Sequence, residues 1–271
     1  MKFDVKHIIV ALMVGTLTSC EVIPEGQQLI PVDMAETNRT TLLVDFSALK
    51  CVNCPNAAEE AHNLQALYGD KLIVVEMHPA SNPLTQAKAE WDYTCDAADA
   101  YYLFFGGNST TPLPTGVINM AKTDDTYFVD YSKWGACYAN SAKAYSPVRM
   151  TQQAIYNPQT RETKIQLSVA NIMSESIDNL QYIAWVTEDS IVGPQAMPDG
   201  SNNMSYTRNH VLRDAITDIW GQALSLAQAE TKTVELTYTL SEKYVAENCN
   251  VVGIIMQDGV VIQAHQVKIH H

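Results

Sequence analysis

The spacing of hydrophobic positions changes near residue 146 and divides the sequence into two parts. In the first part, short apolar runs such as TTLLVDF and KLIVVEMHP alternate with segments whose apolar residues recur every three to four positions. The runs predict buried strands and the segments predict helices, of which residues 56–69 are the clearest. A further strand is expected at 111–120, and a last helix before residue 146. Strands that alternate with helices are typical of an α/β layer fold, which we predict for residues 39–146.

The second part alternates apolar and polar residues with a period of two, which is typical of half-buried strands. Six such runs lie at 148–156, 162–170, 180–188, 231–240, 250–258 and 259–269. Turn-forming sequences separate them, including Asn157-Pro158, Pro198-Asp199-Gly200 and Asp258-Gly259. We therefore predict an all-β sandwich of the immunoglobulin-like kind for residues 147–271, with the boundary near Ser146-Pro147.

Residues 1–19 have the composition of an export signal. Two lysines precede a short apolar run, IIVALMVGTL, which is too short to span a bilayer. The run ends in Leu17-Thr18-Ser19-Cys20, which resembles a bacterial lipobox, so we expect cleavage after residue 19 and acylation of Cys20. An ordinary secretory signal and a cytoplasmic helix are the alternatives. Residues 20–38 show no apolar periodicity and are predicted to tether the fold to the lipid.

The chain is acidic, which restricts its partners. It has 30 Asp and Glu against 17 Lys and Arg, for a formal charge of −13, and loss of residues 1–19 removes two lysines and one aspartate. A surface of this charge repels nucleic acid phosphates, so we predict no nucleic acid partner. A hydrophobic content of 46% allows a core in each of two domains.

Two cysteines in the stretch LVDFSALKCVNCP lie between a predicted buried strand and the start of a predicted helix. A helix start presents free N–H groups and a partial positive charge, which favour the thiolate of Cys51, and Lys50 acts in the same direction. Three interpretations stay open: a fixed Cys51–Cys54 disulfide, a dithiol that exchanges with substrates, and a zinc site. For zinc the sequence offers no second CxxC and no His pair, so no metal or other cofactor is predicted.

The same stretch resembles the thioredoxin-fold oxidoreductases, in which a strand ending VDF leads into a CxxC that opens a helix. The resemblance implies that Cys51 is the attacking thiolate, Cys54 the resolving thiol and Asp45 a buried proton relay. Leu113-Pro114-Thr115 resembles the cis-proline loop of that fold, which makes Pro114 a platform for the substrate backbone. The sequence departs from the thioredoxin pattern at Ser47, Lys50, Val52 and Asn53.

Three further cysteines remain besides Cys20 and the CxxC pair. In an oxidising compartment, a Cys95–Cys137 disulfide across the helical layer is a plausible pairing. Cys249 would then be unpaired and buried at the start of a strand. Two other features are expected to be structural: the lone His210, and an aromatic cluster at 101–105 for which core packing is the first interpretation and an exposed partner site the second.

From about Thr40 onward the chain is similar to a Bacteroidetes outer-membrane lipoprotein family named for a twenty-eight-kilodalton member. The resemblance rests on DFSALKCVNCP, PTG, NHVLRDA with Trp220-Gly221 behind it, and ENCNVV. It implies a thioredoxin-like domain followed by an immunoglobulin-like one, on a lipid-anchored protein of the outer membrane. Our first hypothesis is a binding protein that assists surface assembly, adhesion or nutrient uptake, with an outer-membrane transporter or other envelope proteins as partners. The alternative is a thiol-disulfide oxidoreductase of the cell envelope.

Overall fold

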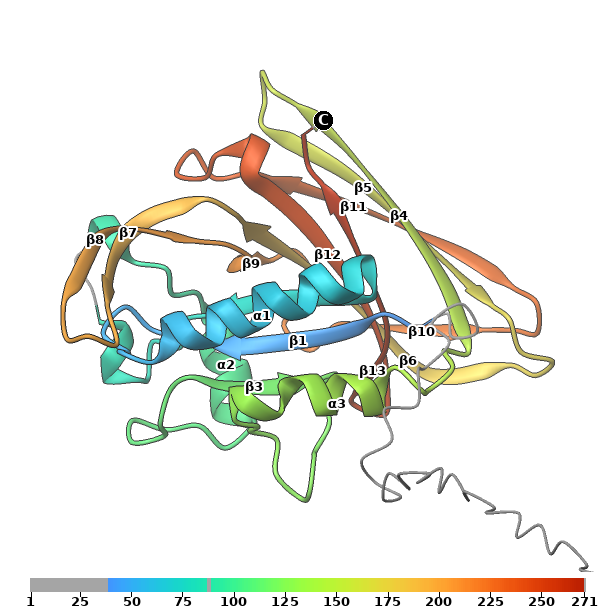
Figure 1. Cartoon of the computed structure of the whole chain (residues 1–271). Helices are drawn as coiled ribbons and strands as arrows, with labels where there is room; N and C mark the ends of the chain where they lie inside the picture. Colours follow the sequence, from blue (N-terminus) through green and yellow to red (C-terminus); the bar gives the residue numbers. More distant parts are fainter. Residues whose placement is uncertain (1–38, 87–88, 271) are drawn as a thin grey trace, which may run out of the picture. The chain divides into compact units, whose positions relative to one another are not determined.

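The predicted strand TTLLVDF is β1 (Thr41–Phe46) in the computed structural model, which describes residues 39–86 and 89–270 (Figure 1). Helix α1 (Cys54–Tyr68) has a proline in its first turn, where the missing N–H costs no hydrogen bond. The chain returns through β2 (Leu72–Met77), which pairs with β1 in parallel. The predicted signal segment, Cys20 and the tether lie outside the described residues.

Two further helices and one strand complete this part of the chain. They are α2 (Asp96–Phe104), β3 (Thr115–Ile118), which pairs with β1 in antiparallel fashion, and α3 (Trp134–Ser141). The peptide bond before Pro114, at the entry to β3, is cis. Alternate residues of β1 and β2 enter two separate hydrophobic clusters, one packed against α2 and the other against α1 and α3. Helices therefore cover both faces of the β2-β1-β3 sheet.

Ten strands follow α3. They are β4 (Val148–Asn157), β5 (Glu162–Asn171), β6 (Ile177–Glu188), β7 (Ile191–Ala196), β8 (Asn202–Arg208), β9 (Val211–Ala215), β10 (Gln222–Leu226), β11 (Thr231–Thr239), β12 (Cys249–Gln257) and β13 (Val260–Lys268). Strands β11, β5 and β4 form one sheet, and β7 and β8 form a separate hairpin. The remaining five strands form one eight-stranded sheet together with β1, β2 and β3. Its order is β13-β12-β6-β9-β2-β1-β3, and β10 pairs with β6.

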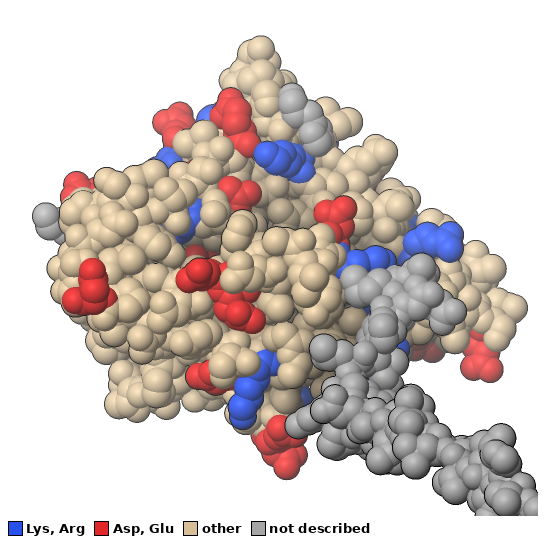
Figure 2. All heavy atoms as spheres, in the orientation of Figure 1, with Lys and Arg blue, Asp and Glu red and all other residues tan. Residues whose placement is uncertain are grey.

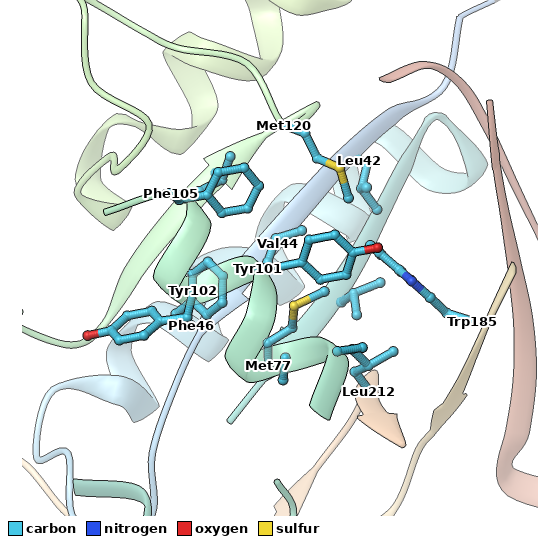
Figure 3. Packing of buried hydrophobic residues seen from close by; sticks show 14 of the residues in the cluster. Leu42, Val44, Phe46, Met77, Tyr101, Tyr102, Phe105, Met120, Trp185 and Leu212 are labelled. Atoms are coloured by element: carbon cyan, nitrogen blue, oxygen red, sulfur yellow. The ribbon is translucent and has the colours of Figure 1, made fainter. Parts of the chain in front are cut away.

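Strands β6 and β12 are buried on both faces, which explains their nearly continuous burial. On one face Trp185 and Ile254 lie in the same cluster as Tyr101 and Tyr102 of α2 (Figure 3). On the other face, their neighbours along the strands pack against the β11-β5-β4 sheet. Because the side chains of a strand alternate between faces, one pair of strands serves both the helical layer and the second sheet.

The structure is a mixed α/β fold with a large content of β-sheet, as the sequence indicates. Within the large sheet, the two parts of the chain are joined by a parallel pairing of Glu76 with Val211, where β2 meets β9. The division at residue 146 and the immunoglobulin-like character of the second part stay predictions. None of the helices in residues 39–86 and 89–270 is long and apolar enough to cross a membrane.

The sequence pattern missed four strands, β7 to β10. Strand β7 contains Gly193 and Pro194, and β8 reads NNMSYTR, so neither shows an apolar alternation. Both belong to a hairpin that lies outside the two main sheets. This hairpin, orange in Figure 1, reaches down to the loop that joins β1 to α1.

Candidate functional site

Cys51 and Cys54 form a disulfide that is almost completely buried. The two sulfur atoms are bonded, and each residue is only 2% exposed. Both belong to the same hydrophobic cluster as Phe46, Ala48 and Leu113, so the residue before the cis-proline packs into the surroundings of the disulfide. The structure thus leaves the disulfide little access to solvent, and the roles that the resemblance implies for Cys51, Cys54 and Pro114 stay predictions.

The β7–β8 hairpin closes over the loop that carries Cys51. The side-chain amide of Gln195 donates hydrogen bonds to the carbonyl oxygens of Cys51, at 2.8 Å, and Ala48, at 3.3 Å. The backbone N–H of Ala196 donates to the carbonyl of Leu49 at 2.8 Å. Three carbonyls of the loop before the disulfide are thus occupied by a segment that lies about 150 residues further along the chain.

A buried arginine holds the hairpin in place. Arg208, at the end of β8, is 1% exposed and donates to the carbonyl of Pro194 at 2.7 Å and to the side-chain oxygen of Gln195. Its Nε lies 3.8 Å from Oε1 of Glu76 in β2, and the same oxygen lies 2.7 Å from Nε2 of His78. One chain of polar contacts therefore runs from β2 through Arg208 and Gln195 to the carbonyl of Cys51.

Glu76 is charged in this environment. Burial alone would raise its pKa, but the hydrogen bond from His78 and the positive charges of His78 and Arg208 outweigh it, so the pKa lies below the ordinary value. Sequence reasoning did not identify Glu76, His78, Arg208 or Gln195. The signal for the first two was present, since a glutamate and a histidine flank a methionine in an otherwise apolar strand.

Asp45 lies beside Glu76 but has no such partners. The two residues are opposite one another in the parallel β1/β2 pairing, and Asp45 is 2% exposed. Its Oδ1 makes no hydrogen bond to any part of the chain that the structure describes. Burial, and secondarily the charge of Glu76, raise the pKa of Asp45 well above its ordinary value. The proton-relay role that the resemblance implies for Asp45 stays a prediction.

Replacing Asp45 with asparagine should stabilise the fold by at least about 1 kcal/mol at pH 7, because the amide cannot ionise, whereas the buried carboxyl must bind a proton on folding. In the unfolded chain the carboxyl titrates near about pH 3.9. The folded pKa lies higher, so between the two values only the folded state keeps the proton. The advantage of Asp45→Asn over the wild type should therefore grow as the pH rises from about 4 through the folded pKa.

Urea unfolding at pH 4 and at pH 7 measures this difference. Glu60→Gln is the control, because it removes an acid from α1 that is not among the buried residues of that helix, and such changes alter stability by at most about 0.5 kcal/mol. Equal stabilities of Asp45→Asn and the wild type at both pH values would contradict the assignment of Asp45 as an uncompensated buried carboxyl.

The predicted Cys95–Cys137 disulfide is absent, which corrects that expectation. Both residues are free thiols. Cys95 precedes α2 and packs with the cluster on one face of the β2-β1-β3 sheet, whereas Cys137 in α3 packs with the cluster on the other face. The sheet lies between them. Cys249 is unbonded and fully buried at the first residue of β12, as predicted.

The contacts of His210 support a structural role. Its backbone N–H donates to Oδ1 of Asp189 at 2.7 Å, its Nδ1 lies 3.1 Å from the same oxygen, and its carbonyl accepts from the N–H of Glu76 at 2.8 Å. These contacts fix the corner that joins β8 to β9. Within residues 39–86 and 89–270, no group of three or more His, Cys, Asp or Glu side chains is suited to hold a metal ion.

The aromatic cluster is divided between core and surface. Tyr101, Tyr102 and Phe105 are buried, as the first interpretation requires, but Phe104 is 58% exposed and lies 4.8 Å from the ring of Trp220, which is 47% exposed. Acidic and basic side chains are scattered over the face shown in Figure 2.

Comparisons with known proteins give a family and a fold. The sequence profile described as outer membrane protein Omp28 matches residues 98–271, which begin within α2 and include everything after it but not the CVNCP stretch. HBP35 of Porphyromonas gingivalis is similar in structure, with a TM-score of 0.65 and 15% identity, over 86% of this chain and 76% of that one. At this identity the likeness shows the fold alone.

Two other solved structures are similar. A protein from Agrobacterium tumefaciens has a TM-score of 0.51 and 12% identity, over 87% of this chain and 97% of that one. A domain of the outer membrane lipoprotein Omp28 from Porphyromonas gingivalis has a TM-score of 0.33 and 19% identity, over 46% of this chain and 90% of that one. Among curated proteins there is no significant match.

Proposed function

Since the chain belongs to the outer membrane protein Omp28 family and is located at the outer membrane, we propose that it is a lipid-anchored binding protein of that membrane. Cys20 is the residue that carries the lipid, and the soluble body follows it. In this proposal residues 39–146 are a thioredoxin-like domain and residues 147–271 an immunoglobulin-like one. The strand order β2-β1-β3, with a CxxC at the start of α1 and a cis-proline before β3, supports the thioredoxin-like assignment.

The observation that carries the proposal is the covered disulfide. Exchange with a protein substrate requires that an incoming thiolate reach one sulfur in line with the S–S bond. Here Cys51 and Cys54 are both buried, and Gln195 and Ala196 occupy the carbonyls of the loop before them. A disulfide in this position is suited to a structural role, in which it fixes the start of α1. The domain then serves recognition, with an outer-membrane transporter or other envelope proteins as partners in surface assembly, adhesion or uptake.

A thiol-disulfide oxidoreductase of the envelope is the second candidate. Three features favour the oxidoreductase. A CxxC lies at a helix start, Asp45 lies on the strand before it, and Pro114 lies in the loop that faces the dithiol in the thioredoxin fold. In that case Cys51 would attack a substrate disulfide and Cys54 would release the mixed disulfide.

The two candidates differ in what happens when Cys51 is removed. For a binding protein we expect the full-length protein in detergent to accelerate reduction of insulin by dithiothreitol no more than its Cys51→Ser variant does. Both should recover the same partner from detergent-solubilised envelopes. A rate enhancement that depends on Cys51 would overturn the proposal in favour of the enzyme, and repeated failure to recover a partner would count against binding.

A further inference from the structure

A cleft of about 320 Å³ lies beside the disulfide, between α1 and the corner that joins β8 to β9. Its floor is Asp45 and Glu76, which stand near the carboxyl ends of the parallel strands β1 and β2. Helix α1 contributes one wall and the segment 206–210 the other. Ligands of α/β proteins commonly bind at the carboxyl ends of parallel strands, and this volume is enough for a small molecule or one long side chain.

The buried carboxyls of the cleft differ in their partners. Glu76 is matched by Arg208 and His78, whose contacts with it are described above. Asp45 has no counterpart, although its side chain is almost fully buried and forms part of the floor. Glu59 adds a third carboxylate at the mouth, and acidic side chains lie over α1 in Figure 2. The histidines that face the cleft are His62 on α1 and His210 on the other wall.

The walls of the cleft have an apolar part, which is formed by Pro55, Ala58 and Ala61 of α1, Val74 of β2 and the ring of Tyr206. Gln65, Thr207 and Asn209 add neutral polar groups to the lining. An apolar wall that ends in an uncompensated carboxyl matches a ligand with an aliphatic chain and a cationic end. The chain would bury its methylene groups against the apolar part of the wall, and the cation would supply the charge that Asp45 lacks.

We propose that this cleft binds an alkylammonium or alkylguanidinium group, as in a lysine or arginine side chain, with the cation on Asp45 and the aliphatic chain along α1. Asp45 touches the ligand, and Glu59 attracts it at the mouth. The acidic charge of the whole chain draws cations toward the site. The inference rests on the proposed binding function and deepens it, because it names the chemistry that a ligand or partner must present.

Binding of n-butylammonium to the full-length protein in detergent tests the proposal, with n-butanol as the uncharged probe of the same length. We expect saturable binding of n-butylammonium, followed by calorimetry or amide NMR, and at least tenfold weaker binding of n-butanol. Asp45→Asn should weaken n-butylammonium binding at least tenfold. Because this variant is expected to be more stable than the wild type, the loss would not reflect unfolding.

Neighbouring glutamates on α1 provide a matched pair of variants. Glu59 lines the cleft, so Glu59→Gln should weaken binding about two- to fivefold, whereas Glu60→Gln should leave it unchanged. Equal affinities for the two probes, or an Asp45→Asn variant that binds n-butylammonium as well as the wild type, would overturn the inference. Absence of n-butylammonium binding from a protein that still captures an envelope partner would overturn the cleft assignment and leave the proposed function standing.

Discussion

Replacement of Arg208 with methionine should lower the free energy of unfolding by about 3 to 5 kcal/mol, the usual cost of removing one partner from a buried ion pair. Methionine has a similar length, so little packing is lost. Glu76 would lose the charge of Arg208 and keep His78 and Ser47 as partners, and the carbonyl of Pro194 and the side chain of Gln195 would lose their donor. Urea unfolding followed by circular dichroism measures the change.

A double-mutant cycle separates the charge from the other contacts of Arg208. Glu76→Gln removes the buried charge, so the double variant should be at least about 1 kcal/mol more stable than the sum of the two single effects indicates. Arg149→Met is the matched control, since Arg149 is exposed on β4 and its loss should change stability by at most about 0.5 kcal/mol. If Arg208→Met and Arg149→Met had equal effects, Arg208 would not be the residue that anchors the hairpin.

The part of the fold that could be predicted from the sequence is the part whose burial leaves a local pattern. Strands β1 and β2 are buried along their length and mostly apolar, and α1 places Ala57, Ala61 and Leu64 toward the sheet at helical spacing. The six alternating runs of the second part are all strands. Strands β7 and β8 left no such pattern, because their hydrogen bonds to the CxxC loop and not an apolar face hold them in place.

The candidate site divides in the same way. The spacing of Cys51 and Cys54 in a short motif was enough to predict that they could bond, and the roles of Asp45 and Pro114 stay predictions. Gln195 and Arg208 come from a hairpin far along the chain, and contacts of this kind leave no periodicity. The missing Cys95–Cys137 disulfide has the same cause, since a sequence does not show that a sheet separates two helices.

Replacement of Gln195 with alanine should make the Cys51–Cys54 disulfide about ten to thirty times more reactive toward dithiothreitol. The wild-type side chain donates to the carbonyls of Cys51 and Ala48 and accepts from Arg208. If the reductant reacts only when the hairpin has lifted, the rate follows the population of that open state. Loss of hydrogen bonds worth about 1 kcal/mol each increases that population by the stated factor.

Reduction under native conditions, followed by alkylation and mass analysis of the peptide that contains Cys51 and Cys54, measures the rate without interference from the three free cysteines. Met204→Ala is the control, because Met204 lies in the same hairpin but is 55% exposed. The accelerated rate of Gln195→Ala should depend only weakly on low concentrations of urea, since a local opening exposes little surface. A steep dependence of the rate on urea, or a rate equal to that of Met204→Ala, would show that the global stability of the fold protects the disulfide and the hairpin does not. The proposal of a covered, non-exchanging disulfide would then lose its structural basis.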